Sequence, residues 1–298
     1  MTNIVTPVSV VRSVPRGADA VGLAVGMSGA VPRQLGLNRS VLNAHGFTGA
    51  VGQTLAVPSR EGPMFVAVGV GDGATANQLR DAAAAFARAA NKRSNLATNL
   101  ADGTSVDAAT AAQAVTEGIL LARYHYVGLK TDSSNDTSLD SVSLVVVAKH
   151  DSAATKGAAH GVVTARAANL ARQLANTPPS HLTAKGIAAK AVELAAESGL
   201  AIEVFDKDQL AVLGCGGLLG VNAGSTEPPR MIKLSYVPRN PKAHVALVGK
   251  GVMYDSGGIS LKPSNPMHAL MKMDMSGAAA VLATMTSLKA LGCRNQVT

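Results

Sequence analysis

The sequence is poor in cysteine and in aromatic residues. Among its 298 residues there are two cysteines, no tryptophan, four phenylalanines and four tyrosines. Cys215 and Cys293 are too few for a disulfide framework or a cysteine zinc site. Because aromatic side chains are scarce, the hydrophobic core must consist mainly of alanine, valine and leucine.

Long apolar runs are also missing. No stretch approaches the roughly 18 consecutive apolar residues that a membrane-spanning helix needs. Residues 1–7 lack the charged region and the continuous apolar core of a secretory signal peptide. We therefore expect a cytoplasmic protein that does not contact membranes.

Clusters of basic residues are absent, although the formal net charge is +8. The lysines and arginines are scattered singly and form no run that would mark a nucleic-acid-binding tail. No zinc-finger spacing and no aromatic-basic RNA-binding pattern occurs. A mildly basic, solvated surface is the favoured interpretation, and nucleic acid is not the expected partner.

The first half of the chain alternates short apolar strands with alanine-rich helices. The strands are expected at 21–25, 64–68 and 143–148, and the helices at 77–92 and 108–123. This alternation predicts an N-terminal α/β domain over residues 1–155.

A helical pattern over 158–176 ends at Asn176-Thr177-Pro178-Pro179, where two prolines forbid its continuation. We interpret residues 156–179 as a linker helix and residues 180–298 as a second α/β domain. Thr183 is expected to cap a helix that Gly199 ends. Further elements are expected as strands at 201–205, 231–236 and 245–248, and as a helix at 276–291. Strand–helix order of this kind predicts a mainly parallel sheet that binds ligands at the carboxyl ends of its strands.

One glycine-rich segment, Gly69-Val70-Gly71-Asp72-Gly73-Ala74, formally matches a dinucleotide-binding fingerprint. That function needs an acidic residue at the end of a second strand about 20 residues later. Asp81 instead falls inside the following predicted helix. A glycine turn is the favoured interpretation.

Four charged residues lie among glycines directly after the strand expected at 245–248: Lys250, Asp255, Lys262 and Asp274. Charges at the end of a buried strand are costly unless they are paired or bind a metal. Aspartate oxygens suit Zn²⁺, Mn²⁺ or Mg²⁺. Lys250 could bind a metal only as a neutral amine, with a pKa far below its usual value of about 10.4. Lys262 would stay charged and neutralise an oxyanion.

Two other interpretations remain open from the residues alone. Lys250–Asp255 and Lys262–Asp274 could be ordinary ion pairs at a strand end. Ser260 and Lys262 could also form a Ser–Lys hydrolase dyad, because they project from one side of an extended segment. The dyad lacks a recognisable oxyanion or third-group pattern.

The stretch Gly249–Pro263, together with Met271-Lys272-Met273-Asp274-Met275, closely resembles the leucine (cytosol) aminopeptidase family, as do Leu174–Pro179 and Gly216–Leu219. The resemblance covers about residues 160–298, and the first half resembles the family's N-terminal domain only weakly. It implies that residues 180–298 belong to an α/β peptidase domain with two divalent ions, Mn or Zn with Mg possible. It also implies peptide substrates, a preference for leucine and a homohexamer.

The resemblance assigns roles residue by residue. Asp255 looks like the carboxylate that bridges both metals, and Lys250 and Asp274 look like further ligands of one of them. Lys262 looks like the cation that polarises the scissile carbonyl. Met271 matches a residue that lines the pocket for the first side chain of the substrate.

Two departures from the family pattern matter. Lys262 and Asp274 are twelve residues apart, where the family has eleven. The family's second block, Asn-Thr-Asp-Ala-Glu-Gly-Arg, is absent, and Lys250, Asp255 and Asp274 alone cannot hold two metals. We therefore expect a fragment of a longer aminopeptidase that is inactive as written and exposes apolar surface. The alternative is a non-enzymatic DNA-binding or scaffold protein derived from the same family.

Overall fold

The computed structural model describes residues 6–131 and 137–298. The chain divides into two compact units, Met1–Arg166 and Ala167–Thr298, which are described separately below. The division falls inside the helix α4 (Asp151–Asn176), on which the predicted linker helix 156–179 lies. Within the described residues, no helix has the length and apolar character that crossing a membrane requires.

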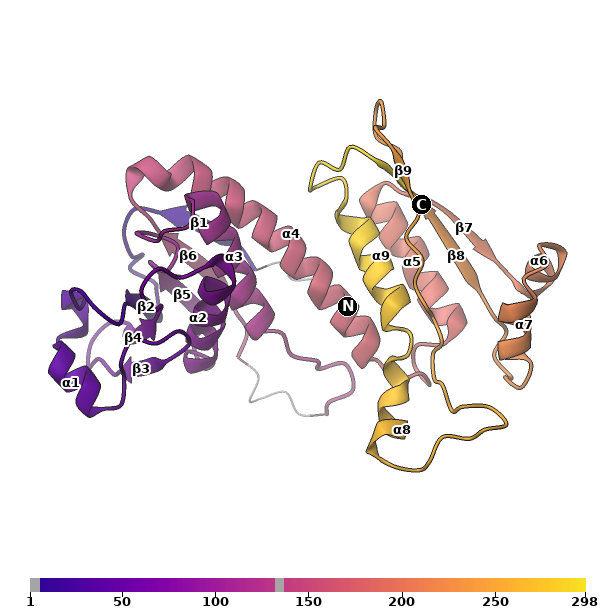
Figure 1. Cartoon of the computed structure of the whole chain (residues 1–298), viewed down its shortest axis with the longest axis horizontal. Helices are drawn as coiled ribbons and strands as arrows, with labels where there is room; N and C mark the ends of the chain where they lie inside the picture. The colour runs from indigo at the N-terminus through magenta and orange to yellow at the C-terminus, as the bar shows by residue number, and fades with distance from the viewer. Residues whose placement is uncertain (1–5, 132–136) are drawn as a thin grey trace. The chain divides into compact units, whose positions relative to one another are not determined.

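A six-stranded sheet forms the centre of the first unit (Figure 1), with the order β1-β6-β5-β2-β4-β3. Its strands are β1 (Val8–Val11), β2 (Ala20–Val25), β3 (Thr54–Val57), β4 (Met64–Gly69), β5 (Asn95–Thr98) and β6 (Ser141–Val145). Every neighbouring pair is parallel except β3–β4. The predicted α/β class with a mainly parallel central sheet is thus confirmed.

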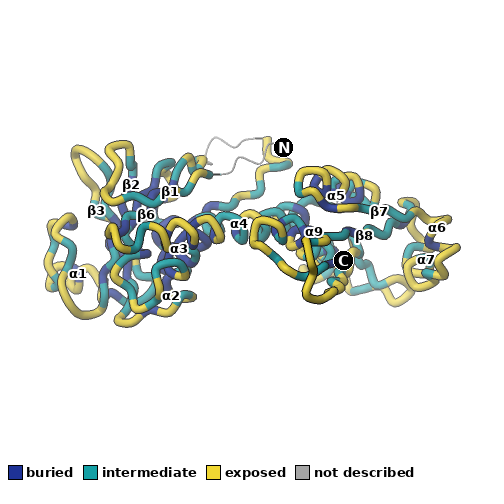
Figure 2. The backbone as a smooth tube through the Cα atoms, turned by 90° about the horizontal axis from the view of Figure 1, so that it is seen from above, coloured by how far each residue is buried: buried dark blue, intermediate teal, exposed yellow. Residues whose placement is uncertain are grey.

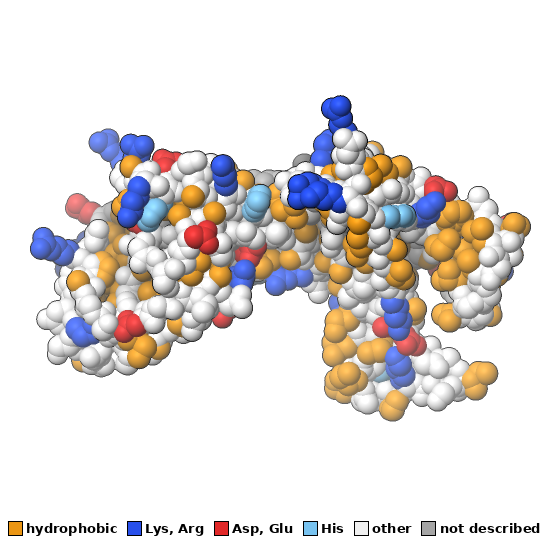
Figure 3. Space-filling view, turned by 45° about the horizontal axis from the view of Figure 1, so that its top comes forward, with side chains coloured by type: hydrophobic (Ala, Val, Ile, Leu, Met, Phe, Trp, Pro, Cys, Tyr) orange, Lys and Arg blue, Asp and Glu red, His pale blue; other side chains and the backbone are white. Residues whose placement is uncertain are grey.

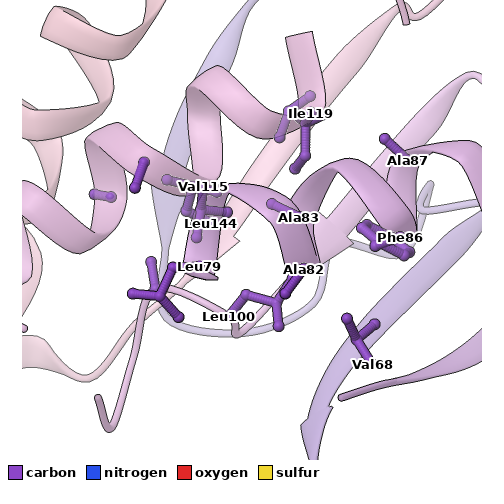
Figure 4. Packing of buried hydrophobic residues seen from close by; sticks show 14 of the residues in the cluster. Val68, Leu79, Ala82, Ala83, Phe86, Ala87, Leu100, Val115, Ile119 and Leu144 are labelled. Carbon is purple, nitrogen blue, oxygen red and sulfur yellow. The ribbon is translucent and has the colours of Figure 1, made fainter. Parts of the chain in front are cut away.

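Helices α2 (Ala76–Ala89) and α3 (Ala108–Ala122) pack on each other and cover one face of this sheet. Both begin where a side chain accepts the first free N–H groups: Thr75 caps α2 within a capping box, and Asp107 caps α3. Figure 4 shows Phe86 of α2 and Ile119 of α3 among the buried residues between the helices and the strands. Small alanines allow the close helix packing that the composition predicts.

The opposite face of the sheet is covered by a short 3₁₀ helix, η1 (Arg33–Leu35), and by α1 (Arg39–Ala44). Leu35, Leu42 and Phe47 pack there against β2 and β4. Figure 2 shows that the buried residues of this unit lie on its strands and on its helices, with exposed residues around them. Helix α4 begins after β6 and a short 3₁₀ helix, η2 (Ala148–His150).

The second unit contains two strand pairs and several helices. Its elements are α5 (Ala184–Ser198), β7 (Ala201–Phe205), α6 (Lys207–Val212), α7 (Gly216–Asn222), β8 (Met231–Ser235), β9 (His244–Val245), α8 (Pro266–Leu270), η3 (Met271–Met273), α9 (Ser276–Ser287) and β10 (Gln296–Val297). Thr183 caps α5 and Gly199 ends it in a left-handed conformation, as predicted. Residues of α5 and α9, including Leu194 and Leu282, build the core with β8.

Strand pairing in the second unit is mixed. The β9–β10 pair is parallel, whereas β7–β8 is antiparallel, so the parallel arrangement expected for this domain holds for one pair only. A bridge from Tyr236 to Val297 connects the two pairs.

The strand predicted over 245–248 is shorter than expected. Its ladder pairs only His244 and Val245 with β10, and Leu247 adds one further hydrogen bond to Thr298. Val248 is 94% exposed. The charged residues that follow therefore leave an open segment and not a buried strand end.

Candidate metal centre

A closed loop places Lys262 next to Asp255. Asp255 Oδ1 accepts a hydrogen bond from the N–H of Gly257 at 2.9 Å, and the N–H of Lys262 donates to Ser256 O at 2.9 Å. Gly257 has φ +94°, and a Cβ there would lie 2.4 Å from Ser260 O. Only glycine fits this conformation and this close approach. The glycine pair of the motif is what lets the chain return on itself.

A second contact brings Lys250 to Asp274. Gly249 lies directly against the first turn of α9, where a Cβ would be 2.5 Å from Gly277 O. The N–H of Ala278 donates to Lys250 O at 2.8 Å. Asp274 follows η3 and precedes α9. The start of α9 therefore holds the Lys250 backbone, and Asp274 lies two residues before this helix.

These two contacts assemble four charged side chains that are spread over 25 positions of sequence, residues 250–274. Lys250 Nζ lies 2.7 Å from Asp274 Oδ2 and 4.0 Å from Asp255 Oδ2, and Lys262 Nζ lies 3.0 Å from Asp255 Oδ2. Figure 3 shows lysine and acidic side chains adjoining one another in the part of the second unit near α8. The close pairs are Lys250–Asp274 and Lys262–Asp255. Of the two ion pairs that the alternative named, Lys250–Asp255 is present at 4.0 Å, whereas Lys262 pairs with Asp255 and not with Asp274.

Electrostatics in the cluster favour the charged forms of Lys250 and Asp255. The close contact with Asp274 and the charge of Asp255 raise the pKa of Lys250 above its usual value, against a smaller effect of burial. The hydrogen bonds from Lys262 and from the N–H of Gly257 lower the pKa of Asp255. The lowered pKa that we predict for Lys250 applies to an amine beside a bound dication, and it stays a prediction. The Lys250 side chain is 57% exposed and faces two carboxylates, so the charged form is favoured.

Lys262 has a second contact within the site. Its Nζ lies 2.8 Å from the sulfur of Met271, the residue predicted to line the substrate pocket. Ser260 is exposed, and the described contacts of the Lys262 ammonium group are with Asp255 and Met271. This arrangement gives no support to the Ser260–Lys262 dyad.

The donor chemistry of the cluster fits a divalent cation. Asp274 Oδ2 is shielded from solvent, and Lys250 Nζ is its close charged neighbour, although no hydrogen bond of normal angle reaches that oxygen in the described part of the chain. Asp255 Oδ2 is shared between two lysines. Oxygens with spare lone pairs beside an amine suit Zn²⁺ or Mn²⁺. Within residues 6–131 and 137–298, no group of three histidine, cysteine or acidic side chains forms a metal site by itself.

Two neighbours of the cluster were not found by sequence reasoning. Lys272 Nζ donates to Asn176 O at the end of α4, at 3.2 Å. Tyr254, the residue before Asp255, donates its hydroxyl to His268 O at 3.2 Å. The joint presence of the 174–179 and 271–275 motifs was a signal for the first contact. Tyr254 and His268 belong to segments that no periodic pattern brings together.

The fold and the cluster define a class: an α/β protein with a lysine–carboxylate site suited to divalent cations. The model of the cytosol aminopeptidase family, catalytic domain, matches residues 169–298, and that of the family's N-terminal domain matches residues 34–133. The chain belongs to the cytosol aminopeptidase family. The predicted family resemblance is therefore confirmed, and it extends into the first half of the chain, where the sequence motifs were weak.

Relatives by sequence carry the same family name. A probable cytosol aminopeptidase of Streptomyces avermitilis is 38% identical over 95% of this chain and 58% of the relative. One of Mycobacterium tuberculosis is 40% identical over 82% of this chain and 49% of the relative. The chain thus spans about half to three fifths of the length of these relatives.

Solved structures agree with the fold. The bottromycin maturation enzyme BotP in complex with Mn has a TM-score of 0.80 and 38% identity, over 94% of this chain and 58% of that one. A mutant of tomato leucine aminopeptidase has a TM-score of 0.82 at 21% identity, over 98% of this chain and 61% of that one. The second likeness concerns the fold alone.

Proposed function

We propose that the chain carries part of the active site of a metal-dependent aminopeptidase, which releases N-terminal amino acids from peptides. The observation that carries this proposal is the cluster of Lys250, Asp255, Asp274 and Lys262 within a few ångströms in a chain of this family. The name of the Mn complex of BotP supports a divalent metal.

Three side chains would hold the metal ions. Asp255 would serve both of them, and Asp274 and Lys250 would complete the ligands that this chain supplies. Bound there, two Mn²⁺ or Zn²⁺ ions would lower the pKa of a water molecule and anchor the free α-amine of the peptide. Lys250 must give up a proton before it can act as a ligand, because its ammonium form has no lone pair.

Lys262 has the role of the electrophile. Its ammonium group, 3.0 Å from Asp255, lies beside the proposed metal ligands without being one. A charged group in this position stabilises the negative charge that develops on the carbonyl oxygen. Met271, in contact with Lys262, would line the pocket for the first side chain of the substrate, for which leucine is the proposed preference.

Residues 1–298 should not hydrolyse peptides by themselves. Two ions in four- to six-coordinate sites need more donors than Lys250, Asp255 and Asp274 provide. The described part of the chain offers no other cluster of histidine, cysteine or acidic residues. We propose that the remaining ligands come from outside these residues.

The test compares the chain with the product of the complete reading frame that contains it. Each protein receives Mn²⁺ or Zn²⁺, and release of p-nitroaniline from leucine p-nitroanilide is measured. Metal-dependent release by the complete product, and its absence from residues 1–298, is the expected result. The proposal is wrong if the complete product shows no metal-dependent release.

Assembly and location follow from the same proposal. The complete protein should form a homohexamer in the cytoplasm, as members of the family do. Light scattering on a size-exclusion column measures the mass of the assembly. A monomeric complete protein would contradict this part.

A further inference from the structure

Apart from Lys250, the residues of the proposed site lie on two segments, and side-chain contacts connect these segments. The first runs from Tyr254 to Lys262, and the second from Asn265 to Asp274. Lys262 Nζ contacts the sulfur of Met271, and the Tyr254 hydroxyl donates to His268 O at 3.2 Å. The Tyr254 and His268 rings also pack together, with centroids 5.6 Å apart and an angle of 40° between their planes. Neither Tyr254 nor His268 has a role in the site as described so far.

Helix α8 holds His268 rigidly at this contact. The N–H of His268 donates to Asn265 Oδ1 at 3.1 Å and to Asn265 O at 3.0 Å, which closes the first turn of the helix. His268 Nε2 is shielded from solvent and has no hydrogen-bond partner within the described residues. A buried polar atom without a partner is costly. Since Nε2 has no such partner, the side-chain contact that the structure describes for the imidazole is its packing on the Tyr254 ring.

The position of α8 determines the position of two site residues. Met271 follows α8 directly, and the N–H of Asp274 donates to Met271 O at 3.2 Å. A displacement of α8 would thus move both Met271 and Asp274. On the other side of the contact between Tyr254 and His268, Asp255 is the residue that immediately follows Tyr254.

The other contacts that connect the site residues involve Lys250 and Lys262, two side chains that the proposed reaction uses. Lys250 is paired with Asp274, and Lys262 is in contact with Asp255 and Met271. When the Lys250 amine binds a cation and Lys262 turns to a carbonyl oxygen, both contacts change. The contact between Tyr254 and His268 uses neither lysine, so it can remain in place throughout.

We propose that Tyr254 is a positioning residue, which holds α8 and η3 against the Asp255 loop so that Asp274 and Met271 keep their places when Lys250 and Lys262 engage metal and substrate. This inference rests on the proposed function. It assigns Tyr254 no contact with the reacting atoms. Its effect is transmitted through His268.

The test uses Tyr254→Phe, which keeps the ring and removes the hydroxyl, and Tyr254→Leu, which removes both. Tyr236→Phe is the matched control, because the Tyr236 hydroxyl donates to Cys293 O at 3.0 Å in the same unit. Amide hydrogen exchange of residues 268–274 is followed by mass spectrometry in each protein. Exchange should be about fivefold faster in Tyr254→Phe, as for the loss of one ordinary hydrogen bond, and faster still in Tyr254→Leu. In Tyr236→Phe it should be unchanged.

A second measurement separates positioning from simple stability. Mn²⁺ titrations followed by electron paramagnetic resonance should show weaker binding and an altered spectrum of the bound ion for both Tyr254 variants. The spectrum of Tyr236→Phe should match that of the unmodified chain, even if its unfolding midpoint falls.

The outcomes keep the two proposals apart. Unchanged exchange at 268–274 in both Tyr254 variants overturns the inference, whatever happens to the metal. Equal changes of the bound-Mn²⁺ spectrum in Tyr254→Phe and Tyr236→Phe also overturn it. If the unmodified chain and the complete product both fail to bind Mn²⁺, the proposed function fails, and the positioning role that depends on it fails too, even where the exchange data show that Tyr254 orders α8.

Discussion

The carboxylates of the two units differ in how far they are buried and in how many hydrogen bonds they accept. In the first unit, Glu117 has a side chain only 10% exposed, and both of its oxygens accept hydrogen bonds. Thr164 Oγ1 donates to it at 2.6 Å, Gln113 Nε2 at 2.9 Å and Arg80 Nε at 2.7 Å. In the second unit, Asp255 and Asp274 face lysines that are partly solvated.

The difference distinguishes a structural charge from a functional one. Glu117 is held by neighbours on α2, α3 and α4, and each of its two oxygens accepts at least one hydrogen bond from them. Asp274 Oδ2, by contrast, is shielded and meets one ammonium group whose proton can be lost. A fully bonded carboxylate stabilises the fold, whereas an incompletely bonded one can accept a cation. The predictions below test this contrast.

The largest effect is expected for Lys262→Ala in the complete protein. Removing the ammonium group should lower kcat by about 1,000-fold, because the charge that develops on the carbonyl oxygen loses its partner. Bound Mn²⁺, measured by atomic absorption, should stay nearly unchanged. Lys233→Ala is the control, since Lys233 forms an exposed ion pair with Glu203 in the same unit. Equal losses of metal and turnover in Lys262→Ala would contradict the assigned role.

Replacing a proposed ligand comes next. Asp274→Asn should weaken Mn²⁺ binding to the chain by at least about 100-fold, beyond the loss typical of residues that only support a ligand. Isothermal titration measures the affinity. Glu203→Gln removes an acidic side chain that pairs with Lys233 away from the cluster, and it should leave the affinity unchanged. If both variants bind Mn²⁺ equally well, Asp274 is not a ligand.

Glu117→Ala should affect stability and not metal binding. Loss of the carboxylate removes the charged partner of Arg80 and one acceptor of Thr164, which costs about 3 kcal/mol of unfolding free energy. Urea unfolding of the first unit measures the change. Glu193→Ala, which breaks the exposed pair of Glu193 with Lys190, should barely change stability. A clear loss of Mn²⁺ affinity in Glu117→Ala would weaken the contrast between the two units.

The smallest expected effect is the pH dependence of the Glu117 contribution. Burial alone would raise the pKa of Glu117, but the hydrogen bonds from Thr164, Gln113 and Arg80 and the charge of Arg80 lower it overall. Its stabilising effect is therefore fully present above the unfolded-state pKa of about 4.3, and it is lost as the pH falls through the lower folded-state value. Urea unfolding between pH 7 and pH 3 should show the difference between the unmodified chain and Glu117→Gln shrinking as the pH falls. A stability difference that grows as the pH falls would contradict the lowered pKa of Glu117.

Much of the local structure could be predicted from the sequence. Thr183 and Gly199 mark the ends of α5, and Asp206 caps α6, because these residues satisfy free backbone groups or tolerate a left-handed turn. The strands β2 and β4 were also predictable, because each is a short apolar run bounded by glycine or proline. The pairing of β1 with β6 could not be foreseen, since it joins residues more than 130 positions apart.

The candidate site was predictable in its residues but not in its pairings. The motif around Asp255 identified the four charged groups, and the family models support the resemblance that it indicated. The loop closed by Gly257 determines which lysine meets which aspartate, and no periodicity encodes that return. The exposure of Val248 and the raised pKa of Lys250 likewise depend on tertiary contacts.

The central claim is that Lys250 and the two aspartates bind a divalent cation together. Calorimetric titration of the chain with Mn²⁺, in buffers of different ionisation enthalpy, counts the protons released on binding. Because the carboxylates raise the pKa of Lys250, its amine must lose a proton to become a ligand, and about one proton per bound ion should be released. The affinity should accordingly rise with pH, and the release should disappear in Lys250→Met. Binding without proton release, or release that persists in Lys250→Met, would contradict the account.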